Sequence, residues 1–275
     1  MIDLHTHILP GVDDGALDVD AALAMAEAFV ADGVTVVACT PHILPGLYDN
    51  AGPAILASIS ALQSELDARA IPLRLVSGAD NYMVPDFIDG LCAGRLLPLN
   101  GGRYVLVEPP HHNAPPRFEE FFFELLTRDL VPVLTHPERL SWIKQHYSTI
   151  QRLADAGVWM QVTAGSLVGR FGRNARFWAE RLLDEGRVHI LASDAHDVDR
   201  RPPELSFGHR LAAQRVGAIE AENLVFVRPR GILRNVPPSS LPTPERRLLA
   251  TTVHNEAGGS RRALRISRGL RRIFE

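Results

Sequence analysis

The chain is 275 residues long, with 46% hydrophobic and 22% charged residues, a mean hydropathy of zero and a formal net charge of −3. This composition excludes disordered, collagen-like and low-complexity proteins, and no apolar run reaches the ~18 residues that would predict a membrane-spanning helix. The two cysteines, Cys39 and Cys92, are too few for a disulfide framework, and the opening Met-Ile-Asp-Leu-His is not a secretory signal, so we expect a cytoplasmic protein.

Up to about residue 220, short apolar runs, which predict strands, alternate with longer amphipathic stretches, which predict helices. The predicted strands are Ile2–His5, Val34–Cys39, Leu73–Val76, Tyr104–Val107, Val131–Thr135, Trp159–Val162 and Val188–Ala192. The predicted helices include Asp18–Ala31, Pro53–Ala68, Arg117–Arg128, Asn174–Glu185 and Leu205–Val216. Seven strand–helix units in series predict parallel strands in a closed α/β barrel, with an open doubly wound sheet as the alternative.

The composition changes after about residue 225. We predict a barrel domain over 1–235, a Pro/Gly-rich linker over 236–260 and a basic tail over 261–275. The tail holds six arginines and one glutamate, which sum to +5, so the other 260 residues carry −8. An acidic body of this kind predicts no nucleic-acid partner. We favour a disordered tail; the alternative is an amphipathic helix that contacts the inner membrane face or a partner protein.

Imidazoles and carboxylates stand at the ends of six of the seven predicted strands. In a parallel barrel all strands end at one rim, so these side chains are expected to meet there. They are His5, His7, His42, Asp80, Glu108, His136, Asp194 and His196. Because side chains alternate along a strand, we expect His5 and His7 to share a face, Tyr104 and Leu106 to point inward below Glu108, and Pro132 and Leu134 to do so below His136.

Five histidines together with carboxylates suit Mn²⁺, Zn²⁺ or Fe²⁺. With Asp14 the set has nine members, more than one ion needs, so two or three ions are predicted. Ions about 3.5–4 Å apart can bridge a hydroxide nucleophile and clamp a phosphoryl group. We assign Arg139 and Arg201, on the adjacent loops, to phosphate binding, with surface salt bridges as the alternative.

Four motifs carry a resemblance to a known family: Asp3-Leu-His-Thr-His7, Thr40-Pro-His42, His136-Pro-Glu-Arg139 and Ser193-Asp-Ala-His196. Together they resemble the PHP (polymerase and histidinol phosphatase) superfamily. The Ile8-Leu-Pro-Gly-Val-Asp-Asp-Gly15 opening and the spacing are similar to those of bacterial manganese-dependent protein-tyrosine phosphatases of capsule and exopolysaccharide operons, over residues 1 to about 235.

The resemblance implies a distorted (β/α)7 TIM-like barrel with three metal ions, Mn²⁺ first, at its rim. The ligand pattern of the family falls on His5, His7, Asp14, His42, Glu108, His136, Asp194 and His196, and its phosphate-binding arginines match Arg139 and Arg201. The implied reaction is hydrolysis of phosphotyrosine on the tail of a membrane-associated tyrosine kinase, which regulates polysaccharide biosynthesis. The sequence leaves a homo-oligomer open.

Position 80 departs from the family pattern, which normally has a glutamate there. Asp80 is shorter by one methylene, about 1.5 Å of reach, so we predict a weaker ion at this position. Asp13 competes with Asp14 as the ligand, and Asp14 fits the superfamily better. Asp3 is either an orienter of the histidines or a buried structural carboxylate. We interpret His111 more readily as an exposed loop histidine than as part of the pocket mouth.

The mechanism we expect is in-line attack by a metal-bridging hydroxide, with His196 or a metal-bound water as the proton donor. A cysteine-based mechanism needs an arginine six residues after the cysteine, but Pro45 and Pro98 stand there. The alternatives are a small-molecule phosphatase similar to histidinol-phosphate phosphatase and a metal-stabilised regulatory module without turnover.

Overall fold

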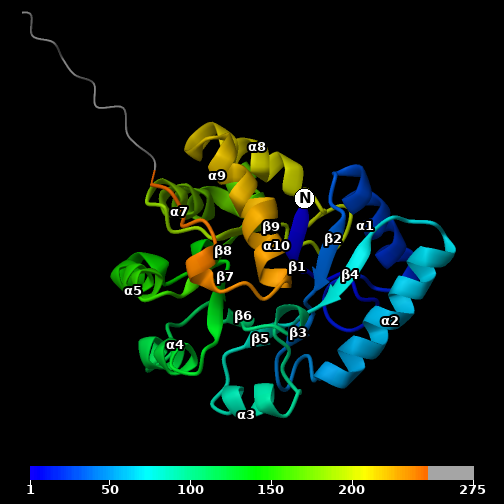
Figure 1. The fold of residues 1–275 in the computed structure, drawn as a ribbon, viewed down its shortest axis with the longest axis horizontal. Coiled ribbons are helices and arrows are strands. Elements are labelled where there is room, and N and C mark those ends of the chain that lie inside the picture. Colours follow the sequence, from blue (N-terminus) through cyan, green and yellow to red (C-terminus); the bar gives the residue numbers. More distant parts are fainter. Residues whose placement is uncertain (247–275) are drawn as a thin grey trace, which may run out of the picture.

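The computed structural model describes residues 1–246, which form an α/β fold around curled parallel sheets (Figure 1). The strands are β1 (Ile2–Thr6), β2 (Val36–Cys39), β3 (His42–Ile43), β4 (Arg74–Ser77), β5 (Asp80–Tyr82), β6 (Tyr104–Glu108), β7 (Val131–Thr135), β8 (Trp159–Thr163) and β9 (Ile190–Ala192). Their hydrogen-bonded orders are β1-β2-β4 and β3-β5-β6-β7-β8-β9, and every strand pair is parallel.

Helices surround these strands in Figure 1, as expected where each strand is followed by a crossover helix. They are α1 (Val19–Ala31), α2 (Gly52–Ala68), α3 (Phe87–Cys92), α4 (Phe118–Leu126), α5 (Ile143–Asp155), α6 (Ala164–Val168), α7 (Gly172–Asp184), α8 (Leu205–Val216), α9 (Ala218–Glu222) and α10 (Arg228–Leu233). Short turns of other helix types are η1 (Leu99–Gly101), η2 (Pro137–Arg139), η3 (Asn223–Val227) and η4 (Pro238–Ser240). No helix within residues 1–246 is long and apolar enough to cross a membrane.

Each of the seven predicted strands overlaps an observed strand, with ends that differ by at most two residues, and each of the five predicted helices matches an observed one to within two residues at either end. The sequence did not predict the two short strands β3 and β5. They begin three residues after β2 and β4 end, across Thr40-Pro41 and Gly78-Ala79. Pro41 has no N–H to donate, and a Cβ on Gly78 would lie 2.9 Å from Thr40 Cγ2. The paired ladder therefore breaks at these two points and continues in the second sheet.

The outer edges of the two sheets meet where β1 and β9 end. The His7 N–H donates to the Ala195 carbonyl at 2.9 Å, and the Asp194 N–H donates to the His5 carbonyl at the same distance. Thr6 and Ala195 form an isolated parallel bridge. These bonds bring the motifs after β1 and β9 together although they are almost 190 residues apart in the chain.

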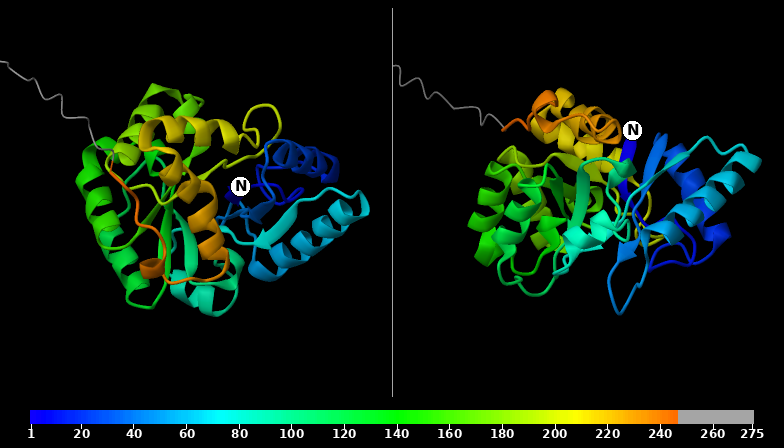
Figure 2. Two further views of the ribbon diagram at one scale, coloured as in Figure 1. Left: turned by 45° about the horizontal axis from the view of Figure 1, so that its top comes forward. Right: turned by 60° about the horizontal axis from the view of Figure 1, so that its bottom comes forward.

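The interior between the strands is filled by one apolar cluster that includes Ile2, Leu4, Leu106 and Ile190, with Ile232 of α10 at the end where the strands begin. Figure 2 shows the N-terminus and the orange segment that contains α10 together at that end. Tyr104 and Leu106 lie in this cluster, which confirms their predicted inward direction.

The inward direction predicted for Pro132 and Leu134 is wrong. The inner cluster contains Val131 and Val133, whereas Leu134 packs in the larger cluster between strands and helices. His136 still reaches the site, because its backbone adopts a left-handed conformation with φ of 33° directly after β7. This turn breaks the strand alternation on which the prediction depended.

The first part of the predicted linker lies against the fold. Tyr104 Oη donates to the Val236 carbonyl at 2.7 Å, and Arg228 Nε donates to the Pro242 carbonyl at 2.7 Å. Leu241 packs against the inner cluster and over Gly231, where a Cβ would lie 2.3 Å from the leucine Cδ2. The predicted tail over 261–275 lies outside the described residues.

Candidate active site

The nine predicted ligands lie together at the carboxyl ends of the strands. Their ligand atoms fall into overlapping groups in which all the atoms are within 4.8 Å of one another. The members are His5, His7, Asp14, His42, Asp80, Glu108, His136, Asp194 and His196, and His111 joins them. The site is built from β1, β3, β5, β6 and the segments that follow β1, β6, β7 and β9.

The deepest part of the site is formed by His5, His7 and Asp194. The two Nε2 atoms lie 3.3 Å apart, and they lie 3.5 Å and 3.4 Å from Asp194 Oδ1. Asp80 Oδ2 lies 3.4 Å from His5 Nε2. All four side chains are buried, so these ligand atoms converge on one point that protein atoms shield from water.

Asp80 links this deep part to His42, His136 and Glu108. Its Oδ2 lies 3.5 Å from His42 Nδ1 and 3.9 Å from His136 Nε2, and Glu108 Oε2 lies 3.1 Å from His42 Nδ1. Among the described residues, neither Asp80 oxygen has a hydrogen-bond partner of acceptable geometry, and the same holds for His42 Nδ1 and His196 Nε2. Buried polar atoms are rarely left unpaired, because the lost hydration is costly. This donor set fits divalent cations.

Asp13 and Asp14 have different surroundings. Asp14 Oδ1 lies 3.3 Å from His196 Nε2 and 3.5 Å from His42 Nε2, within one ligand group. Asp13 Oδ2 lies 2.7 Å from His7 Nδ1 and also accepts from the His42 N–H. Of the two carboxylates, only Asp14 is directed at the ligand atoms, and Asp13 orients His7 from behind.

Sequence reasoning missed the residue that orients His5. Gln161 on β8 places Oε1 2.9 Å from His5 Nδ1 and also accepts from the His136 N–H. The predicted strand Trp159–Val162 is the one of the seven for which the sequence predicted no site residue. The polar Gln161 within this otherwise apolar strand was the feature that could have identified it. Asp3 instead accepts from the backbone N–H groups of His5 and Ser193, so it fixes the backbone between β1 and β9.

Arg139 and Arg201 both bind the same carboxylate oxygen. Arg201 Nη2 donates to Asp194 Oδ2 at 2.6 Å, and Arg139 Nη1 donates to the same atom. Asp194 thus presents one oxygen to the histidines and the other to the two guanidinium groups. Within residues 1–246, the ion pairs of both arginines are with buried Asp194 and not with an exposed carboxylate. Two cations therefore lie beside the ligand cluster, where they can bind the oxygens of an anion.

A family model described as capsular polysaccharide synthesis, CpsB/CapC, matches residues 1–234, which include every residue of this site. The chain belongs to the CpsB/CapC family. Among its relatives, the tyrosine-protein phosphatase YwqE of Bacillus subtilis is 36% identical over 201 residues, covering 73% of this chain and 79% of that protein. The tyrosine-protein phosphatase CpsB of Streptococcus agalactiae is 25% identical over 244 residues, covering 86% and 99%.

One solved structure superposes on this chain with a TM-score of 0.83. It comes from a study of YwqE from Bacillus subtilis and CpsB from Streptococcus pneumoniae, which are described there as unique metal-dependent tyrosine phosphatases. Its identity is 32%, and the match covers 90% of this chain and all of that one. The β-aspartyl dipeptidase of Fervidobacterium islandicum, at 15% identity and a TM-score of 0.50, shares the fold alone.

Electrostatics in this CpsB/CapC-family site keep the carboxylates ionised. Burial raises the pKa of Asp194, but the charges of Arg201, His5 and Arg139 outweigh it and hold the pKa well below its usual range. Burial lowers the pKa of His5, but the charges of Asp80 and Asp194 raise it to about 9. Burial and the charge of His7 lower the pKa of His196 to about 4. A divalent ion held by these ligands would replace the protons that they bind.

His111 lies beside the ligand cluster and is half-buried, so its interpretation as an exposed loop histidine is wrong. Its Nε2 lies 3.1 Å from Glu108 Oε1, and its ring centroid is 4.8 Å from that of His136. The available signal was its position three residues after Glu108, on a loop that leaves the same rim. Its neighbour His112 is exposed.

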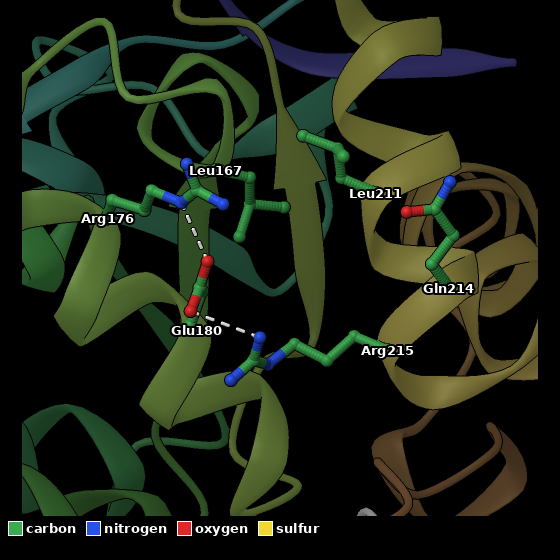
Figure 3. A pocket seen from close by; sticks show the side chains of 6 residues that line it. All are labelled: Leu167, Arg176, Glu180, Leu211, Gln214 and Arg215. Carbon is green, nitrogen blue, oxygen red and sulfur yellow. Dashed lines mark hydrogen bonds and ion pairs between the residues drawn. The ribbon is translucent and has the colours of Figure 1, made fainter.

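A second pocket, outside the site, lies between α6, α7 and α8 and is shown in Figure 3. Its lining residues are Leu167, Arg176, Glu180, Leu211, Gln214 and Arg215. Glu180 forms ion pairs with Arg176 at 2.8 Å and Arg215 at 3.1 Å, and Arg215 also binds Asp184. These charges are already compensated within the pocket wall, so the rim cluster remains the candidate for chemistry in this family member.

Proposed function

We propose that the chain is a metal-dependent protein-tyrosine phosphatase that removes phosphate from phosphotyrosine on a partner bacterial tyrosine kinase and so regulates capsular or exopolysaccharide biosynthesis. The observation that carries this proposal is the buried set of imidazoles and carboxylates with unpaired ligand atoms, next to two arginines that meet at Asp194 Oδ2. The names of the relatives supply the substrate class.

We further propose that the strands form one seven-unit barrel of the PHP type. In this interpretation β2 and β3 are two halves of one broken strand, and so are β4 and β5. The pairs Cys39–Ser77 in one sheet and His42–Asp80 in the other support it, because both breaks occur at the same level. A break just before His42 and Asp80 turns both side chains into the rim.

The nine predicted ligands would hold two or three ions, Mn²⁺ first and Zn²⁺ or Fe²⁺ as alternatives. His7, Asp14, His42 and His196 form the more exposed group, and the buried Asp80 and Glu108 each belong to two of the other groups. When bound, such ions supply a nucleophilic hydroxide at neutral pH and neutralise phosphoryl oxygens. The lowered pKa of His196 leaves its imidazole unprotonated at neutral pH, which favours a ligand role over proton donation.

The residues of the chain itself would bind and orient the substrate. Arg139 and Arg201 present guanidinium groups that match the non-reacting phosphoryl oxygens, and Asp194 holds both in place until the phosphate arrives. Tyrosinate has a conjugate acid with a pKa near 10, so it leaves without strong proton assistance. His111, half-buried at the edge of the site beside Glu108, would meet the ring of the substrate.

The test is hydrolysis of a phosphotyrosine peptide by metal-free protein titrated with Mn²⁺, Zn²⁺ and Fe²⁺. We expect activity that requires metal, is lost with a chelator and is insensitive to iodoacetamide. Histidinol phosphate serves as the comparison substrate: faster turnover of it would favour the small-molecule phosphatase. Protein that binds the ions but hydrolyses neither substrate would contradict the proposal and favour a regulatory module.

A further inference from the structure

We propose that Phe171 is a positioning residue that holds both phosphate-binding arginines through the face of its ring. The inference rests on the proposed function, since it concerns the same phosphate site. Phe171 lies in the turn between α6 and α7. Its phenyl side chain has no atom that could bind a metal ion, unlike the imidazoles and carboxylates of the site.

The ring of Phe171 is shared by two cations from separate parts of the chain. Arg139 Cζ, from η2, lies 4.3 Å from the ring centroid, and Arg201 Cζ, from the loop after β9, lies 5.9 Å from it. Both distances are within the ~6 Å range over which a guanidinium is attracted by the negative face of an aromatic ring. The same two groups meet Asp194 Oδ2.

The ring itself is fixed by α6. A Cβ on Gly165 would lie 3.1 Å from Phe171 Cε2, so the ring packs closely on the helix backbone at a position where a side chain would push it away. Gly169 and Gly172 on either side of the turn have φ of 90° and 86°, which glycine adopts without strain. The turn that presents the ring therefore depends on three glycines.

A buried carboxylate joins the turn of Arg139 to this helix. Glu138, directly before Arg139, accepts from the Thr163 N–H at 3.0 Å and from Ser166 Oγ at 2.7 Å, at the start of α6. The side chain is fully buried and is not a member of any of the ligand groups found among the described residues. Glu138 therefore couples the position of the guanidinium to the position of the ring.

The ring of Phe171 attracts both guanidinium groups without carrying a charge, which Asp194 cannot do. If Asp194 held a metal ion while phosphate was bound, its negative charge would be shared, and it would hold the two guanidinium groups less strongly. A neutral aromatic face continues to attract both cations without competing with the phosphate for hydrogen bonds. Its effect falls on phosphate binding and not on metal binding.

The test compares Phe171→Leu and Phe171→Tyr in the metal-loaded protein, with inorganic phosphate as the calorimetric ligand. We expect Phe171→Leu to raise the phosphate Kd about five- to thirtyfold and Phe171→Tyr to stay within about twofold, since tyrosine keeps the aromatic face. Metal content and the thermal midpoint are expected to match wild type in both. Phe177→Leu, an exposed phenylalanine on α7, is the matched control and should change nothing.

A second measurement separates a positioning role from simple packing. In an Arg139→Lys background, where the planar cation is gone, Phe171→Leu should weaken phosphate binding by a clearly smaller factor than in wild type. Equal losses in both backgrounds, or a Phe171→Tyr protein as weak as Phe171→Leu, would overturn the inference. If wild type binds phosphate but hydrolyses no phosphotyrosine with any metal, the proposed function fails while the calorimetric comparison still decides the role of Phe171.

Discussion

The fold contains two clusters of buried charge at opposite ends of its strands, and they differ in how completely they are paired. At the end where the strands begin, Arg228 is fully buried and places Nη2 2.8 Å from both oxygens of Glu220. Its Nε donates to the Pro242 carbonyl, and Asn223 donates to Glu220 Oε2. At the rim, Asp80 is equally buried, yet neither oxygen has a hydrogen-bond partner among the described residues.

This difference in hydrogen bonding distinguishes a structural charge cluster from a functional one. A buried ion pair whose donors and acceptors are satisfied within the chain fixes the position of a helix and needs no ligand. A buried cluster in which several converging ligand atoms lack hydrogen-bond partners is stable only if protons or cations neutralise it. Both clusters bury charge, but only at the rim do buried ligand atoms lack hydrogen-bond partners among the described residues, and this identifies the rim as the site.

The largest expected effect is on catalysis at the rim. Arg139→Ala should lower kcat/KM for a phosphotyrosine peptide by about 10²–10³-fold, because it removes a cation aimed at the transferred group. Steady-state kinetics in saturating Mn²⁺ measure this. Arg152→Ala removes an exposed arginine paired with Glu119 and should leave the rate unchanged. A similar loss in both variants would mean that global stability, and not phosphate binding, was affected.

Removing one charged partner from each cluster should lower the free energy of unfolding by very different amounts. Glu220→Gln leaves Arg228 buried without its counter-charge and should cost about 3–5 kcal/mol of unfolding free energy. Asp80→Asn in metal-free protein should cost less than about 1 kcal/mol, because neighbouring imidazoles can release protons whereas a guanidinium cannot. Urea unfolding of the two variants measures the contrast, and equal costs would show that both clusters are structural.

A longer carboxylate side chain at position 80 should strengthen metal binding at the rim. Asp80→Glu adds one methylene of reach toward the ligand cluster, so the ion that we predict to be weakest is expected to bind about tenfold more tightly. Calorimetric titration of metal-free protein with Mn²⁺ tests this, with Asp49→Glu on the exposed loop after β3 as the control. Three tight and equivalent ions in wild type would contradict the weaker site.

A change of pH tests the end of the strands opposite the rim. Burial and the charge of Arg228 lower the pKa of His189 to about 3, and its Nδ1 accepts from the Met160 N–H. A depressed folded-state pKa gives stability that is present above about 6.5 and is lost as the pH falls, by at most about 1.4 kcal/mol per pH unit. His189→Asn should flatten this part of the stability curve, whereas exposed His112→Asn should not.

Strand positions and the imidazoles and carboxylates at the strand ends were predictable because they depend on local patterns. The apolar runs have the length and composition of strands, and residues such as His5 and His136 stand at their ends whatever the tertiary arrangement. The orienting contacts were not predictable in the same way. Gln161 meets His5 across 156 residues, and the amide carries no signal for metal chemistry.

The sequence by itself determined an α/β chain with parallel strands, an acidic body and a set of metal-ligating residue types at one rim. Only the tertiary structure decided that Asp14 and not Asp13 faces the cluster, that a left-handed turn brings His136 in, and that His111 and Phe171 border the site. The physical reason is that periodicity is a property of neighbouring residues. Convergence of side chains depends instead on backbone breaks and turns that join distant segments.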